Sequence, residues 1–251
     1  MPSTATFLQC LINLILLQAF QQHLLFFSLE SVSVTVSEAQ TLLSELVPTK
    51  ATGPDGIPAL VLSQCSEIIA PSLATLFNLS LRQGKVPSEW KRTNVVPIPK
   101  KGDAHEVINY RPVSLLSLVS KILERVLFSR IPDFATNNLH DLQYGFRPKR
   151  SCVTQLLQVL HELGCALDTG KEIDVIYLDF SKAFDSVSHN KLLFKLKSYG
   201  ISGSLFDWLS DYLSDRKQRV VVEGISSEYL DVTSGQFPKG AFSVLCFSYF
   251  M

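Results

Sequence analysis

The chain has 251 residues, of which 46% are hydrophobic and 18% charged, with a formal net charge of zero. This composition excludes a largely disordered chain, and the length suffices for one or two domains with a hydrophobic core. The charges are unevenly spread, because residues 85–150 carry 12 basic and 6 acidic side chains between two acidic flanks. A basic middle segment of this kind is compatible with a polyanionic partner and equally with an ordinary solvated surface.

Residues 1–29 are mostly apolar and contain no Lys or Arg, since the first basic residue is Lys50. A signal peptide has a positively charged start, and a spanning helix needs about 20 unbroken apolar residues. Polar residues interrupt this stretch at Gln18, Gln21, Gln22 and His23. We expect a packed helix here, with a secretory or membrane anchor as the alternative. The five scattered cysteines, odd in number and without C-x-x-C spacing, predict reduced, mostly buried thiols in an intracellular protein.

The first half of the chain predicts two helices and one extended segment. Ser37 is expected to cap a short amphipathic helix that ends near Pro48, and a turn-rich loop follows. The apolar period of Ala70–Leu81 predicts a second helix that stops at Gly84. The segment Asn94–Pro99 is expected to be an edge strand at best, because its prolines lack the amide proton that a central strand donates.

The second half predicts four helices, one buried strand and a hairpin. The helices are expected at Leu115–Ile131, Cys152–Ala166, Ser188–Tyr199 and Leu205–Leu213. The β-rich, apolar run Glu172–Asp179 predicts a buried strand that ends on a carboxylate, and the alternating segments 219–223 and 227–233 predict the arms of a hairpin. These elements place the chain in the α+β class.

Asp179 is the candidate for chemistry. A carboxylate at the end of a buried strand is costly to desolvate without a partner, and here Phe184 and Asp185 follow five and six residues later. Phosphoryl transfer uses such carboxylates to fix a divalent metal ion that orients a triphosphate. The structural alternative is that Asp179 only caps the turn after the strand.

Five phrases in order carry a resemblance: K-A-T-G-P-D-G-I-P, P-I-P-K-K-G-D, Y-R-P-V-S-L-L-S-L-V-S-K-I-L-E, Q-Y-G-F-R-P-K-R-S and Y-L-D-F-S-K-A-F-D-S-V. Together they resemble the reverse transcriptases of non-LTR retrotransposons over residues 30–235. The resemblance implies the fingers and the first part of the palm of a right-hand polymerase in that range. Residues 1–29 and the tail 236–251 fall outside it.

The resemblance implies roles at the end of the expected strand. Asp179 matches the first metal-binding aspartate of the palm, and Phe180 would offer its backbone carbonyl to the second metal ion, Mg²⁺ or Mn²⁺. Phe184 matches the aromatic residue that excludes a ribose 2′-hydroxyl. These matches imply an RNA-directed DNA polymerase with deoxynucleoside triphosphates, an RNA template and a DNA primer as its partners.

The resemblance also implies binding roles for residues in the basic segment. Lys100, Lys101 and Arg111 match the finger positions that grip the incoming triphosphate, a suitable task for Arg forks and Lys point charges. We expect Asp179 and Phe184 to line one cleft that Arg111 also faces. The positions that match the element against the template strand are Gln143, Gly145, Phe146 and Arg147. Ordinary solvation is the alternative for all of these charges.

The resemblance ends after Thr233. The family pattern S-G-V-P-Q-G-S is replaced by S-G-Q-F-P-K-G, and the later Ala-Asp-Asp element does not occur in this sequence. We therefore expect an incomplete polymerase that is inactive alone. Two other classes stay open: a non-enzymatic nucleic-acid-binding protein that uses the basic segment, and a small membrane-associated protein that uses residues 1–29.

Overall fold

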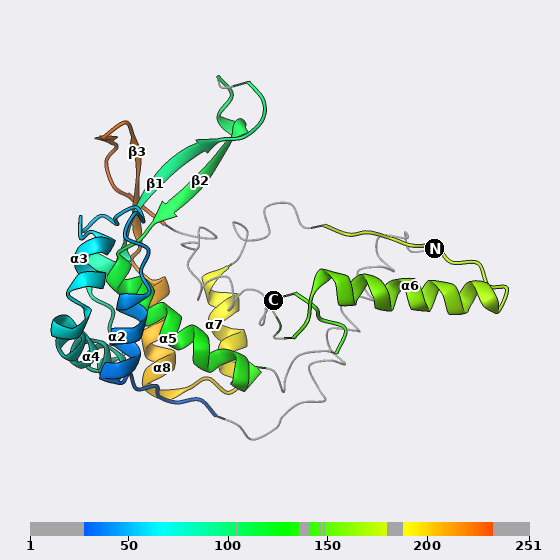
Figure 1. The fold of residues 1–251 in the computed structure, drawn as a ribbon, viewed down its shortest axis with the longest axis horizontal. Coiled ribbons are helices and arrows are strands. Elements are labelled where there is room, and N and C mark those ends of the chain that lie inside the picture. The colour runs from blue at the N-terminus through cyan, green and yellow to red at the C-terminus, as the bar shows by residue number, and fades with distance from the viewer. Residues whose placement is uncertain are drawn as a thin grey trace.

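A computed structural model of the chain describes residues 28–103, 105–135, 141–145, 147, 149–179 and 188–232, with side chains of 131–135 left out (Figure 1). Its helices are α2 Val36–Ser44, α3 Ala59–Gln64, α4 Ser66–Gln83, α5 Leu118–Ala135, α6 Cys152–Asp168, α7 His189–Ser198 and α8 Gly203–Leu213, with 3-10 turns η1 Ser88–Lys91 and η2 Val107–Asn109. Its strands are β1 Arg92–Pro99, β2 Tyr110–Leu115, β3 Lys217–Val222, β4 Ile225–Ser226 and β5 Leu230–Asp231. The mixture confirms the α+β class.

One hydrophobic core joins the helices on the left of Figure 1. Helices α2, α4, α5, α7 and α8 all contribute buried side chains to it, and α3 adds two more. The rings of Phe77 and Trp90 meet edge to face at 5.9 Å between centroids, and those of Trp208 and Tyr212 stack at 5.2 Å. We call α2–α5, α7 and α8 the helical body. Since residues before 50 and after 190 share this core, the ends of the described chain fold together.

Helix ends follow the sequence closely but not completely. α4 ends at Gly84 as predicted, because Gly84 has φ +62° and closes the helix without a Cβ in the way. α7 begins after Ser188, also as predicted. The predicted cap of α2 is wrong: the side chain of Thr35, not that of Ser37, accepts the amide hydrogen of Glu38. The Glu38 carboxylate in turn accepts the amide hydrogen of Thr35. This reciprocal capping box starts the helix earlier than expected.

The sheet has the order β2-β1-β3-β4, with β5 also on β3. β1 is therefore central in its first half, so the prediction of an edge strand for Asn94–Pro99 is wrong at Asn94 and Val95 and is confirmed for the rest of that range among the described strands. It pairs antiparallel with β2 from Asn94 to Pro99 and parallel with β3 from Arg92 to Val95. Pro97 and Pro99 lie beyond that parallel pairing, where one side of β1 is open and a missing amide proton costs nothing. β3 with β4 and β5 forms the predicted hairpin.

The predicted buried strand at Glu172–Asp179 is wrong in the described structure. Residues 171–179 have no regular structure, and Ile176, Tyr177 and Leu178 are 76%, 90% and 74% exposed. A strand needs a neighbour for its backbone hydrogen bonds, and the described strands pair only around β1 and β3. α6 directly precedes this segment at its predicted position, but none of its residues is buried.

Two smaller expectations concern the cysteines and residues 1–29. Cys65, Cys152 and Cys165 are free thiols, but the prediction of burial is wrong, since Cys65 is half-buried and the other two are exposed. Cys10 and Cys246 lie outside the described residues, as does the packed helix expected within 1–29. In the ranges that the structure describes, no helix is both long enough and apolar enough to span a membrane.

Candidate functional site

The β1–β2 hairpin brings two of the expected nucleotide-binding residues together. Ile98 pairs with Arg111, and the Lys100 amide donates to the Asn109 carbonyl at 2.6 Å, which extends the ladder by one step. Opposed residues of an antiparallel pair share a face, and so do alternate residues along a strand. Lys100 and Arg111 therefore lie on the same face of the hairpin, and both are exposed.

The turn that follows β1 is held by its own hydrogen bonds. The Lys100 Nζ donates to the Ile108 carbonyl at 3.2 Å, and the Asn109 Nδ2 donates to the Asp103 carbonyl at 2.9 Å. Gly102 has φ +138°, and a Cβ there would lie 2.8 Å from the Asn109 Nδ2, so this position requires glycine. Lys101 is exposed beside it. The turn thus presents two exposed ammonium groups on a defined backbone.

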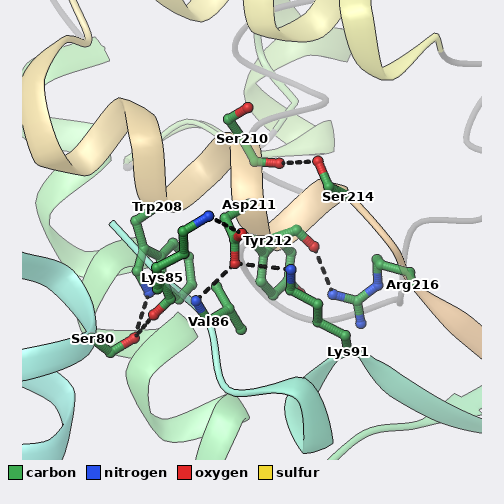
Figure 2. A network of polar contacts seen from close by, with 10 residues as sticks. All are labelled: Ser80, Lys85, Val86, Lys91, Trp208, Ser210, Asp211, Tyr212, Ser214 and Arg216. Carbon is green, nitrogen blue, oxygen red and sulfur yellow. Dashed lines mark hydrogen bonds and ion pairs between the residues drawn. The ribbon is translucent and has the colours of Figure 1, made fainter. Parts of the chain in front are cut away.

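The base of the hairpin is tied to α8 through Asp211 (Figure 2). Its Oδ2 accepts the Lys91 Nζ at 2.8 Å and the Val86 amide at 2.9 Å, and its Oδ1 accepts the Lys85 Nζ at 3.0 Å. Burial alone would raise the pKa of the Asp211 carboxyl, but the hydrogen bonds from Lys91, Val86 and Lys85 outweigh it and lower that pKa. Asp211 is therefore held as a carboxylate.

The next residue of α8, Tyr212, contacts Arg216, the residue that precedes β3. Its carbonyl accepts the Arg216 Nη1 at 3.0 Å, and the Arg216 guanidinium lies 4.6 Å from the ring centroid (Figure 2). The Tyr212 hydroxyl donates to Glu124 of α5 at 2.9 Å, and Ser120 donates to the same carboxylate oxygen at 3.2 Å. Complete burial raises the pKa of Glu124, while the charge of Arg216 counteracts part of that rise.

Sequence reasoning did not find the two charged pairs Lys91–Asp211 and Glu124–Arg216, although a signal exists for one of their members. Glu124 lies on the helix row of Ser117, Ser120 and Leu127, which the apolar period of α5 predicts to be buried. A carboxylate on such a row needs a buried partner. Its partner Arg216, and the pair Lys91–Asp211, could not be matched from sequence because well over 80 residues separate the members.

The expected template-binding residues lie close to α6. Gln143 Nε2 donates to the Gly145 carbonyl at 3.4 Å, and the Arg147 Nη2 lies 3.6 Å from Asp141 with its side chain 13% exposed. The Tyr144 hydroxyl donates to Gln158 of α6. Phe146 lies outside the described residues. Because Arg147 is largely covered and faces a carboxylate, it offers less charge to a ligand than its place in the motif implied.

Asp179 is not brought to the hairpin. It ends the exposed segment 171–179, which Figure 1 draws as an extended trace apart from β1 and β2. The expected single cleft lined by Asp179 and Arg111 is thus not formed by the described residues, and Phe180 and Phe184 lie outside them. Within the described ranges no three His, Cys, Asp or Glu side chains gather in a way that could hold a metal ion.

Comparisons with known proteins agree with the motifs. Residues 98–244 match the family profile described as reverse transcriptase (RNA-dependent DNA polymerase). The chain is 32% identical to the RNA-directed DNA polymerase from mobile element jockey of Drosophila funebris, over 83% of this chain and 23% of that protein. It is 31% identical to the probable RNA-directed DNA polymerase from transposon BS of Drosophila melanogaster, over 75% of this chain and 21% of that protein.

A third relative widens the range of elements. The chain is 31% identical to the retrovirus-related Pol polyprotein of the type-1 retrotransposable element R2 of Popillia japonica, over 55% of this chain and 19% of that protein. The chain spans less than a quarter of the length of these relatives. The profile covers more than half of the chain. On these grounds the chain belongs to the reverse transcriptase family, within the polymerases of non-LTR retrotransposons.

Proposed function

We propose that this chain carries the fingers and the first part of the palm of a retrotransposon RNA-directed DNA polymerase, within a domain that covers residues 30–235. The observation that carries the proposal is the shared, exposed face of Lys100 and Arg111 at the end of one hairpin. The single core of the helical body supports the start of the domain before residue 98. An intracellular location follows from a role on RNA and deoxynucleotides.

The hairpin end is suited to a triphosphate. Arg111 presents a guanidinium fork that can bind two phosphate oxygens at once, while Lys100 and Lys101 add point charges on the adjacent turn. Moving Lys100 from the Ile108 carbonyl to a phosphate exchanges a neutral acceptor for a charged one. Charge-assisted hydrogen bonds are about twice as strong as neutral ones, which favours this exchange. We propose that this face binds the phosphates of a deoxynucleoside triphosphate.

The template and the metal ion involve other residues. Gln143, Gly145, Phe146 and Arg147 are proposed to lie along an RNA template that pairs with a DNA primer, and Phe184 to select deoxyribose. Reverse transcriptases generally use divalent metal ions, and Asp179 with the Phe180 carbonyl would be ligands of Mg²⁺ or Mn²⁺. The described residues do not fit a complete metal site, because no three His, Cys, Asp or Glu side chains gather among them in a way that could hold a metal ion. We therefore assign no reaction step to a metal in this chain.

Nucleotide binding tests the proposal directly. Fluorescently labelled dATP would be titrated with the 251-residue chain and with a Lys100→Gln, Arg111→Gln double variant. The matched control is Lys191→Gln with Lys197→Gln, which removes two exposed charges from α7. We expect the hairpin variant to bind about tenfold more weakly, since each lost phosphate contact costs up to about 1 kcal/mol. Equal affinities in all three proteins would contradict the proposal.

A binding protein without chemistry is the second candidate. The observation that favours it is that the hairpin end forms without Asp179 beside it. An Asp179→Asn variant separates the two functions, because it leaves the hairpin untouched. Nucleotide and primer–template affinity unchanged by this variant, together with no primer extension by the natural chain, would favour the binding protein. Extension that depends on Asp179 would favour the polymerase.

A further inference from the structure

Two consecutive residues of α8 hold the residues from which two paired strands start. Asp211 binds Lys91, the last residue before β1, and Tyr212 binds Arg216, the last residue before β3. The first residues of these strands, Arg92 and Lys217, are partners in the parallel register. Figure 2 shows Lys91 and Arg216 reaching α8 side by side. The sheet is thus fastened to the helical body at this point.

The Asp211–Lys91 pair differs from an ordinary surface ion pair. Both side chains are largely covered, at 14% and 11% exposed, whereas Lys85 on the same carboxylate is 72% exposed. Exposed pairs contribute little, but breaking a covered and hydrogen-bonded pair leaves one charge desolvated. The Val86 amide on the same oxygen fixes the approach to η1 as well. Lys91 is therefore the contact through which Asp211 acts on β1.

The length of β1 amplifies a change at its base. The strand has eight residues, and at about 3.3 Å per residue its far end lies roughly 26 Å from Lys91. Over that length a rotation of about 5° moves the end by roughly 2 Å, which is enough to break a hydrogen bond to a bound phosphate. Beyond Val95 β1 has β2 as its one partner strand among the described residues, so the outer hairpin has little other support.

We propose that Asp211 is a positioning residue: through Lys91 it orients the β1–β2 hairpin so that Lys100 and Arg111 meet the phosphates of the nucleotide. The inference rests on the proposed function, since it assigns Asp211 a role in nucleotide binding at that same face. Asp211 itself contacts no ligand. Its removal therefore changes affinity only as far as the hairpin contributes to it.

The test compares Asp211→Asn with Ser80→Ala in the full chain. Ser80 accepts the Trp208 Nε1 hydrogen at 2.9 Å and donates to the Lys85 carbonyl at 2.5 Å in the same network, so its variant removes two neighbouring hydrogen bonds but leaves the Asp211–Lys91 pair in place (Figure 2). Labelled dATP affinity is measured beside amide hydrogen exchange of residues 92–115. We expect Asp211→Asn to bind about five- to tenfold more weakly, as small misplacements cost this much or more, and to exchange faster in that segment. We expect Ser80→Ala to leave both the dATP affinity and the hydrogen exchange of residues 92–115 unchanged.

A second comparison shows whether Asp211 acts through the hairpin. In the Lys100→Gln, Arg111→Gln background, Asp211→Asn should cost no further affinity, because the contacts that it positions are gone. Lys91→Gln should match Asp211→Asn, and Lys91→Arg should restore most of the binding. An equal fold loss in both backgrounds, or an Asp211→Asn chain that binds like the natural one, would overturn the positioning role. A natural chain that binds no nucleotide would instead overturn the proposed function, and this inference with it.

Discussion

The helical body and α6 have similar amphipathic sequences, but their apolar residues differ in burial. In the helical body the apolar rows of α4, α5 and α8 are buried against one another. In α6 the corresponding row stays in solvent, with Val153, Leu156 and Leu160 at 65%, 60% and 61% exposed. The following segment 171–179 is exposed as well, up to Asp179. An apolar period therefore predicts that a helix forms, but its burial depends on a partner surface.

The residues to which we assign functions also lie in these two different parts. The hairpin with Lys100 and Arg111 is fastened to the helical body, whereas Asp179 ends the exposed segment beyond α6. Binding groups on a rigid support keep their geometry, and groups on an unsupported segment do not. In the function that we propose, nucleotide binding and metal-dependent chemistry would therefore draw on separate parts of this chain.

The largest expected difference is in stability. Leu123→Ala, at a fully buried position of α5, should lower the free energy of unfolding by about 2–5 kcal/mol, because it removes packed methyl groups and leaves a cavity. Leu160→Ala on α6 should change it by about 0.5 kcal/mol or less. Urea denaturation followed by circular dichroism measures both. If the two variants lost similar amounts of stability, α6 would be packed in solution, which would contradict the contrast between α6 and the helical body.

Asp211→Asn should lower the free energy of unfolding by about 1–2 kcal/mol, because Lys91 loses a charged partner in a covered site. The pKa of Asp211 is lowered by folding, so the natural stabilisation is present above its unfolded pKa and is lost as pH falls through the folded one. The difference between the two proteins should therefore shrink below about pH 4. Thermal unfolding between pH 3 and pH 7 would test this, and a constant difference would contradict it.

Glu124 should give the opposite pH dependence. Burial raises its pKa in the folded protein, so the folded state binds the proton more tightly than the unfolded state. Its contribution is fully present below the unfolded pKa and is lost as pH rises through the folded pKa. Across that window the natural chain should lose stability relative to Glu124→Gln, which does not titrate. Parallel stability curves from pH 4 to pH 8 would show that Glu124 is not perturbed.

These internal ion contacts mark the limit of what the sequence predicts. Local signals placed α4, α6, α7 and α8, because caps, periods and Gly84 act within a few residues. Where the outcome depended on distant partners, prediction failed: β1 is central because β3 pairs with its first half, and the strand expected to end at Asp179 has no described neighbour. Lys100 and Arg111 were grouped because both match finger motifs of the family, and the pairing of β1 with β2 places them on one face.

The smallest effect is expected at the template-binding segment. Arg147→Gln should weaken binding of an RNA–DNA primer–template by about twofold, since Arg147 is largely covered beside Asp141. If the basic segment engages about four to six phosphates, log affinity should fall with log salt at a slope of roughly −3 to −5. Fluorescence anisotropy at several salt concentrations gives both values. A loss for Arg147→Gln larger than that for the Lys100→Gln, Arg111→Gln pair would move the main contact to the α6 side.

Primer extension tests the separation of binding from chemistry most directly. Purified chain and an Asp179→Ala control would be incubated with RNA template, DNA primer, deoxynucleotides and Mg²⁺ or Mn²⁺, with binding measured in the same samples. We predict binding by both proteins and extension by neither, because no three His, Cys, Asp or Glu side chains among the described residues gather to hold a metal ion, and positioning dominates phosphoryl transfer. Extension by the natural chain that the Asp179→Ala chain lacks would contradict this account.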